Sequence, residues 1–126
     1  METLVKPTLA ESIDIVKDQL TRAADQYISA IERITALQSE LFRAELALQN
    51  KEQQIIAANA EDPKALGSNE AARKAAIAAQ TQTETANVKD YELKLLHARM
   101  ESDIAKVRLD QAKTSVRLLE LYWGRM

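Results

Sequence analysis

The stretch AEDPKALGSNEAARK, residues 60–74, decides the fold of this chain because it concentrates the residues that interrupt helices. It contains Pro63 and Gly67, one of the two prolines and one of the two glycines among the 126 residues. The other two, Pro7 and Gly124, lie far from this stretch in the sequence. Proline lacks the amide hydrogen that a helix interior uses, and glycine loses the most backbone entropy there. The sequence therefore predicts one chain reversal at its midpoint, between two long helical segments.

The same stretch has the residues that a turn between helices requires. A residue before proline avoids the helical region, so the first helix is expected to stop at Asp62 and Pro63. Gly67 can adopt a positive φ, which residues with a Cβ disfavour. Ser68 or Asn69 is expected to cap the second helix through its side-chain oxygen.

The chain is short enough to form one domain, residues 1–126. Within it we expect a helix over about residues 8–60, a turn over 61–68 and a second helix over about 69–123. Hydrophobic residues make up 46% of the chain but aromatic residues only 4%, which favours long alanine-rich helices over a mixed core. Each helix would be roughly 80 Å long at about 1.5 Å per residue. Arms of equal length favour antiparallel pairing.

Both predicted helices carry apolar residues at the a and d positions of a heptad repeat, as a coiled coil requires. In the first helix the a positions are Ile13, Leu20, Tyr27, Ile34, Leu41, Leu48 and Ile55, and the d positions are Leu9, Val16, Ala23, Ala30, Leu37 and Ala44. In the second helix the a positions are Val88, Leu95, Ser102, Leu109, Val116 and Trp123, and the d positions are Tyr91, Ala98, Ala105, Ala112 and Leu119. The repeat in the first helix fails at Lys51. We therefore expect an all-α antiparallel two-helix coiled-coil hairpin, closed at its open end by Trp123 against Pro7 and Leu9.

The start of the second helix, EAARKAAIAAQTQTETAN (residues 70–87), is less regular. Thr81, Thr83 and Thr85 alternate along the chain as they would in a strand. The alternation is short and lies within many alanines, so a helix is the better prediction here.

The two halves of the chain carry opposite excess charge. Residues 1–62 have six Lys or Arg and eleven Asp or Glu, whereas residues 63–126 have eleven and eight. This difference favours pairing between the two arms, although each exposed ion pair contributes only about 0–1 kcal/mol.

The second helix also has a second apolar face, opposite its heptad seam. Its members are Leu93, Leu96, Met100, Ile104, Val107, Leu118 and Leu121. Isolated exposed leucines are common on proteins, but an apolar patch of this size is more typical of an interface. We expect this interaction face to pair two copies of the chain into a four-helix bundle, so that the protein is a homo-oligomer with a dimer favoured.

The sequence shows no pattern of residues that predicts catalysis. His97 is the only histidine, there is no cysteine, and ALGSNE (residues 65–70) lacks the features of a phosphate-binding loop. A surface histidine is the favoured interpretation of His97. We expect no catalytic, cofactor-binding or metal-binding residue, and therefore no enzymatic activity.

Charge and hydropathy bear on the setting of the protein. The formal net charge is −2, and the basic residues of the second helix alternate with acidic ones, which disfavours binding to nucleic acid. No apolar run reaches the roughly 20 residues that a membrane-spanning helix needs. The start, METLVKPTLAES, does not resemble a signal peptide, and the lack of cysteine fits a reducing compartment. A soluble cytoplasmic protein without a membrane partner is the expectation.

The turn and the start of the second helix, KALGSNEAARKAAIAAQTQ, resemble small phage-encoded helical-hairpin proteins of uncharacterised function. The matching residues are Leu66, Gly67, Asn69, Glu70 and Arg73, with Pro63 preceding them in the turn. This resemblance implies a phage or prophage accessory protein, encoded among genes of DNA replication and recombination. It implies no active site.

Three functions remain open at this stage. The first is a non-enzymatic coiled-coil protein-interaction factor, a phage accessory protein that acts on DNA metabolism or on a host or defence complex. The second is a nucleic-acid-binding hairpin that uses the basic end of the second helix. The third is a cytoplasmic export or assembly chaperone, similar to the flagellar export coiled-coil proteins, whose apolar face holds a client.

Overall fold

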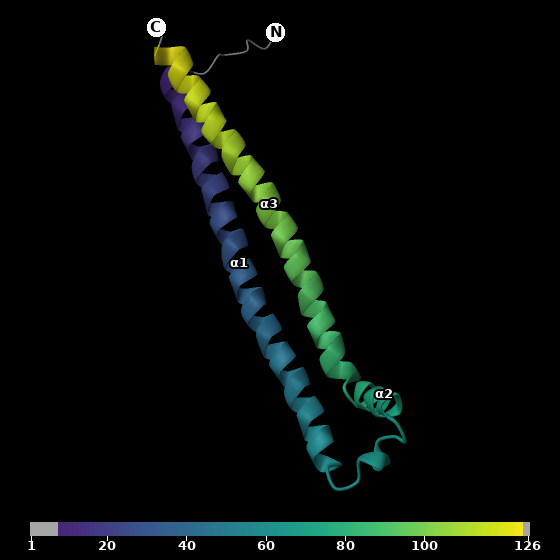
Figure 1. Ribbon diagram of the computed structural model, residues 1–126. Coiled ribbons are helices and arrows are strands. Elements are labelled where there is room, and N and C mark those ends of the chain that lie inside the picture. The colour runs from purple at the N-terminus through teal and green to yellow at the C-terminus, as the bar shows by residue number, and fades with distance from the viewer. Residues whose placement is uncertain (1–7, 125–126) are drawn as a thin grey trace, which may run out of the picture. The chain divides into compact units, whose positions relative to one another are not determined.

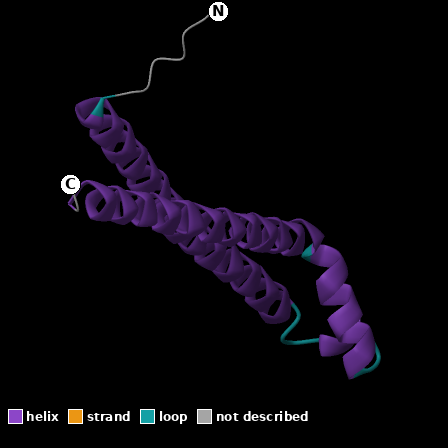
Figure 2. Cartoon of the chain, turned by 90° about the horizontal axis from the view of Figure 1, so that it is seen from above, coloured by secondary structure: helices purple, strands orange, loops and turns teal. Residues whose placement is uncertain are grey.

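The computed structural model describes residues 8–124, apart from the side chain of Trp123 and the exposure of Gly124. Its elements are α1 (Leu9–Ala58), the short 3-10 helix η1 (Pro63–Ala65), α2 (Glu70–Gln80) and α3 (Gln82–Gly124) (Figure 1). The described residues contain helices and loops and no strand (Figure 2). The expectation of an all-α fold is confirmed, and the long helices α1 and α3 are in contact. The expected contact of Trp123 with Pro7 lies outside the described residues.

The chain divides into two compact units, and each is described by itself. The terminal unit consists of residues 1–33 and 98–126, and the middle unit consists of residues 34–97. Helices α1 and α3 each contribute to both units.

In the terminal unit α1 and α3 pack against each other in opposite directions. Ile13 of α1 lines a small hollow together with Val116 of α3. Further along α1, Ala30 lines a second hollow together with Ala105. The residue numbers rise along one helix as they fall along the other, so the two segments are antiparallel.

Burial in the terminal unit follows the heptad seam predicted from the sequence. All the described seam residues are buried or half-buried except Leu9, which is 39% exposed. The buried hydrophobic residues of this unit are Ala23, Ala98, Ala105 and Ala112. Ser102, at an a position, is buried among them. The buried positions of the seam in this unit therefore carry very small side chains.

The middle unit has a core of larger side chains. Leu37 and Ile55 of α1 and Val88 and Leu95 of α3 are buried there. The remaining seam residues of this unit are half-buried, as the heptad repeat predicts. Where the repeat fails, Lys51 is exposed.

Helix α1 begins with a capping box that the sequence contains as Thr8-x-x-Glu11. The amide of Glu11 donates a hydrogen bond to Oγ1 of Thr8 at 3.2 Å, and the amide of Thr8 donates to Oε2 of Glu11 at 3.2 Å. These two bonds satisfy amide groups that have no partner within the first turn of a helix. The expected start at about residue 8 is thus one residue from the observed start at Leu9.

In the turn between α1 and α2, the structure confirms the expected helix cap and shows what Gly67 is needed for. Oδ1 of Asn69 accepts a hydrogen bond from the amide of Ala72 at 2.8 Å, so Asn69 is the N-cap of α2. Gly67 does not adopt the positive φ that glycine permits, because no described residue has one. Glycine is needed there for space: a Cβ at Gly67 would lie 2.7 Å from the Cβ of Ala72 and 2.9 Å from the amide nitrogen of Arg73.

The expectation of one continuous second helix over residues 69–123 is also wrong, since α2 and α3 are separate helices. The break is at Thr81, whose φ of −116° and ψ of 22° lie outside the helical region. Its hydroxyl donates to the carbonyl oxygen of Ile77 at 2.9 Å and offers the backbone an alternative to the helical bond. Of the three alternating threonines, Thr81 lies at the break, whereas Thr83 and Thr85 lie within α3, so the expectation of a helix rather than a strand there is confirmed.

Candidate interaction surface

The terminal unit exposes a row of large apolar side chains on α3. Met100, Ile104 and Val107 follow one another at spacings of four and three residues, which places them on one side of the helix. Their exposed fractions lie between 52% and 56%. Two further members of the predicted interaction face, Leu118 at 61% and Leu121 at 53%, belong to the same unit.

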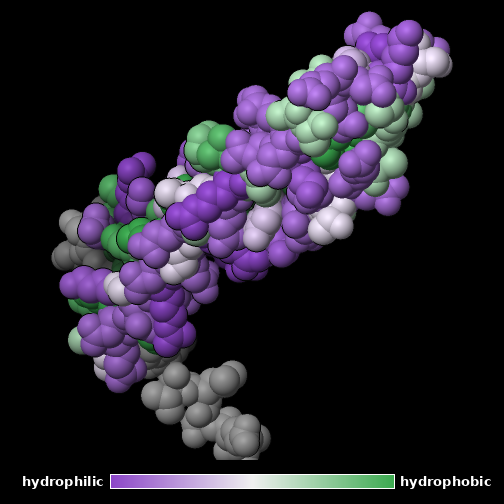
Figure 3. Space-filling view, turned by 90° about the horizontal axis from the view of Figure 1, so that it is seen from below, coloured by the Kyte–Doolittle hydropathy of each residue, from purple (hydrophilic) through white to green (hydrophobic). Residues whose placement is uncertain are grey.

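The other predicted members of the face, Leu93 and Leu96, belong to the middle unit. They are 57% and 54% exposed. All seven residues of the predicted face are therefore accessible. Figure 3 shows apolar atoms at the surface in separate patches among hydrophilic ones.

The described large apolar residues of the terminal unit are half-buried or exposed. Its buried hydrophobic residues are alanines, whereas its exposed ones include isoleucine, methionine, valine and leucine on α3. Helix α1 adds Ile15, Ile28 and Ile31 to the exposed set. Burying one large aliphatic side chain gains about 1.5–3 kcal/mol. Each of these exposed aliphatic side chains thus keeps apolar surface in water within the single chain.

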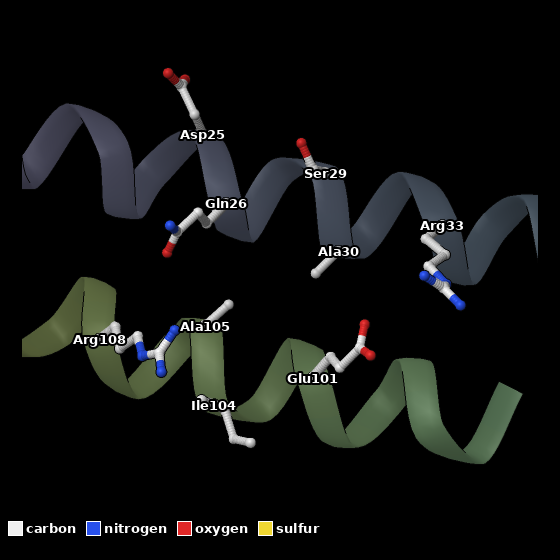
Figure 4. Close-up of a pocket in the computed structure, with 9 residues that line it drawn as sticks. All are labelled: Asp25, Gln26, Ser29, Ala30, Arg33, Glu101, Ile104, Ala105 and Arg108. Carbon is white, nitrogen blue, oxygen red and sulfur yellow. The ribbon is translucent and has the colours of Figure 1, made fainter. Parts of the chain in front are cut away.

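A groove of about 620 Å³ runs between α1 and α3 of the terminal unit (Figure 4). Its lining residues are Asp25, Gln26, Ser29, Ala30, Arg33, Glu101, Ile104, Ala105 and Arg108. Ala30 and Ala105 point toward each other between the two helices (Figure 4). Their small side chains leave the space that forms the groove.

Four charged residues mark the ends of this groove, and their signs alternate. Asp25 of α1 and Arg108 of α3 lie at one end, and Arg33 of α1 and Glu101 of α3 lie at the other (Figure 4). Each helix therefore contributes one acidic and one basic residue. The ion pairs among the described residues are Asp18–Arg22, Glu70–Lys74 and Asp90–Lys94, and each joins two residues four apart on one helix. None of them includes the four charged residues of the groove.

The groove is continuous with the exposed apolar row of α3. Ile104 and Arg108 line the groove and also a neighbouring hollow of about 370 Å³. Val107, a member of the apolar row, lines that hollow as well. An apolar strip and four charges of alternating sign thus form one surface of the terminal unit.

Among the described residues, no group of three or more His, Cys, Asp or Glu side chains could hold a metal ion. His97 is exposed, as the sequence analysis expects for a surface histidine. In the part of the chain that the structure describes, no helix is both long and apolar enough to cross a membrane.

The predicted turn residues form a separate cluster in the middle unit. Nε of Arg73 donates a hydrogen bond to the carbonyl oxygen of Gly67 at 3.1 Å, and Asn69 caps α2 as described above. Pro63 opens η1, and Leu66 is half-buried. These residues hold the turn in shape, and none of them lines the groove.

One side chain of the middle unit has a perturbed pKa. Nζ of Lys94 lies 3.0 Å from Oδ2 of Asp90 and 5.2 Å from the centroid of the Tyr91 ring. The hydrogen bond to Asp90 is the main cause that raises the pKa of Lys94 above its ordinary value, and the negative charge of Asp90 adds to it.

Sequence reasoning missed the groove, although the heptad repeat contained a signal for it. Arg33, Glu101 and Arg108 occupy g positions, which flank the seam, and Asp25 is at the adjacent f position. In an antiparallel pair the g positions of the two helices lie on the same side. From the sequence alone, the charges of the second helix are instead expected on a solvated face. Comparisons of the chain with protein-family models, with curated proteins and with solved structures find no match.

Proposed function

We propose that this chain is a helical protein-interaction factor that works as a homo-oligomer and not by catalysis. The observation that carries the proposal is the exposed apolar row of α3 in the terminal unit. Met100, Ile104 and Val107 are more than half exposed there, beside a seam whose buried hydrophobic residues are alanines. A second copy that covers this row would bury the side chains that the single chain leaves in water.

The architecture that we propose for the chain is an antiparallel coiled-coil hairpin, and two hairpins would form a four-helix bundle. Burial of the a and d positions of α1 and α3 in each unit supports the hairpin. The opposite direction of α1 and α3 in the terminal unit supports it as well.

The setting that we propose is that of a phage or prophage accessory protein acting on DNA metabolism or on a host or defence complex. The likeness of the turn to phage-encoded helical proteins supports this setting. The residues of that likeness, Gly67, Asn69 and Arg73, form the hydrogen bonds that shape the turn.

The test compares two substitutions that lower the net charge by the same amount. Val107→Glu places a carboxylate within the apolar row, whereas Lys106→Gln changes the neighbouring residue, which is also exposed. We expect the wild type and Lys106→Gln to be oligomeric by light scattering and Val107→Glu to be monomeric. An unpaired carboxylate in an interface costs several kcal/mol. Circular dichroism should show equal helix content in all three proteins.

Two results would overturn the proposal. A wild type that stays monomeric at high protein concentration would show that the row does not bind a second copy. An oligomer that survives Val107→Glu would show that the contact lies elsewhere. A mobility shift of single-stranded DNA that weakens with salt would favour the nucleic-acid-binding alternative instead.

A further inference from the structure

We propose that two copies of this chain meet groove to groove, with a two-fold axis that passes at the level of Ile104 and Ser29. In this arrangement α3 lies on α3 of the second copy in the opposite direction. Glu101 then faces Arg108 of the second copy, and Asp25 faces Arg33 of the second copy. This inference rests on the self-association proposed above and adds the surface, the orientation and the register of the two copies.

The alternating charges of the groove are the first argument for a second copy. The two acidic and two basic groups occupy the corners of a quadrilateral, and neighbouring corners have opposite signs (Figure 4). A half-turn about an axis across the helices exchanges the two ends of the groove. It therefore places each acidic group opposite a basic group of the other copy. A surface that matches itself in this way is what a two-fold interface requires.

The register that pairs these charges also pairs apolar side chains. An antiparallel contact centred on Ile104 brings Ile104 close to its own copy. It also brings Met100 close to Val107 of the second copy, because these two residues lie four before and three after Ile104. All three are more than half exposed in the single chain. The same symmetry thus satisfies the charges and the apolar row.

The small residues between the helices allow the two copies to approach. Ser29 lies on α1 at the level of Ile104, and it is exposed. Ala30 and Ala105 leave the groove open beside it. Because these side chains are short, α1 can lie close to α1 of the second copy without a clash, as small residues permit between packed helices.

A different two-fold axis, parallel to the helices, would also pair the charges but would mismatch the other side chains. It would place α3 on α1 of the second copy, with Arg108 opposite Asp25. The apolar row of α3 would then lie near the outer side of α1, where Asp18, Asp25 and Glu32 are exposed. Carboxylates against aliphatic side chains lose hydration without gaining partners. The axis across the helices instead places the apolar row of α3 on the same row of the second copy. It brings Asp25 near both Glu32 and Arg33 of that copy, and Arg33 supplies the opposite charge.

The first test is charge reversal followed by rescue. Arg108→Glu places two pairs of like charges in the dimer, and we expect the dimer dissociation constant to rise about tenfold or more in low salt. Adding Glu101→Arg to Arg108→Glu restores opposite charges across the proposed axis, so dimerisation should return to nearly the wild-type level. Adding Asp25→Arg to Arg108→Glu should give no comparable rescue. Sedimentation velocity over a range of concentrations measures all of these proteins.

The second test uses the absence of cysteine from the sequence. Ile104→Cys introduces a single thiol at the proposed axis, where it meets the same thiol of the second copy. A disulfide needs Cα atoms within about 7 Å of each other, so mild oxidation with diamide should link the two chains. Lys113→Cys is the control, because residue 113 lies at an e position on the other flank of α3 and should stay unlinked.

The outcomes separate this inference from the proposed function. A monomeric wild type overturns both. A second outcome overturns this inference alone: Val107→Glu dissociates the dimer, but Arg108→Glu leaves it intact and Ile104→Cys forms no disulfide between the chains. The proposed function would then still hold. A third outcome would establish the axis parallel to the helices and overturn the arrangement proposed here. In that outcome Asp25→Arg restores dimerisation of Arg108→Glu, and Ile104→Cys is linked to a chain carrying Ser29→Cys but not to another copy of itself.

Discussion

Oγ1 of Thr81 donates a hydrogen bond to the carbonyl oxygen of Ile77 at 2.9 Å, and α2 ends at this point. The amide of Thr81 bonds to the carbonyl oxygen of Ala78 at 3.3 Å, which is the tighter spacing of a 3-10 turn. Thr81 is only 2% exposed, so its side chain fills space as well as bonding to the backbone. A single buried threonine thus separates two helices that its alanine-rich surroundings would join.

Thr81→Ala should make residues 70–124 more continuously helical. The substitution removes the hydroxyl that competes with the backbone, and alanine favours a helix over threonine by up to about 0.7 kcal/mol. Backbone chemical shifts of residues 80–83 should move toward helical values, whereas Thr81→Ser, which keeps the hydroxyl, should retain the break. A break that persists in the alanine variant would show that packing in the middle unit maintains it.

Gly67→Ala should destabilise the protein by about 1–3 kcal/mol, as overpacking does elsewhere. The added Cβ would meet the Cβ of Ala72 at 2.7 Å and its carbonyl carbon at 2.8 Å. Gly67→Asn should cost at least as much, because the constraint is space. If asparagine were well tolerated while alanine was not, the position would require a positive φ after all, since asparagine adopts that conformation readily. Urea unfolding of the three proteins at equal concentration measures the difference.

Leu37→Ala should lower the free energy of unfolding by about 2–5 kcal/mol, the usual cost of truncating a buried leucine. Leu37 is 8% exposed on α1 of the middle unit. Phe42, on the same segment of α1, is 61% exposed, and Phe42→Ala should change the free energy by no more than about 0.5 kcal/mol. Equal effects of the two substitutions in urea unfolding would contradict the observed seam.

The pKa of Lys94 should lie above its ordinary value and should fall when Asp90 is replaced by asparagine. The hydrogen bond to Asp90 is the largest cause of the raised pKa, and the charge of Glu40 adds a smaller contribution. Since the folded pKa is the higher one, the ion pair stabilises the fold below the ordinary pKa of lysine. That contribution disappears as the pH rises through the pKa of the folded state. NMR titration of the Lys94 side chain should show a larger decrease for Asp90→Asn than for Glu40→Gln.

The sequence alone determined which side of α1 and which side of α3 is turned toward the other helix. A heptad repeat fixes one side of a helix geometrically, because residues three and four apart share a face whatever they contact. Leu37 and Leu95 are buried for that reason, and Leu93 and Val107 are exposed for the same reason. The N-cap at Asn69 was also among the predictions from the sequence, because the hydrogen bond that forms it joins residues only three apart.

Only the tertiary structure showed that the second helical segment breaks at Thr81, why residue 67 is glycine, and that a groove lies between α1 and α3 in the terminal unit. Thr81 combines a local hydrogen bond to Ile77 with burial in the middle unit, and Gly67 is set by its closeness to Ala72. The groove requires the relative height of α1 and α3, which places Arg33 at the end that holds Glu101 and Asp25 at the end that holds Arg108. A heptad repeat fixes the face of each helix but leaves its position along the partner open, because sliding by one heptad presents the same pattern again.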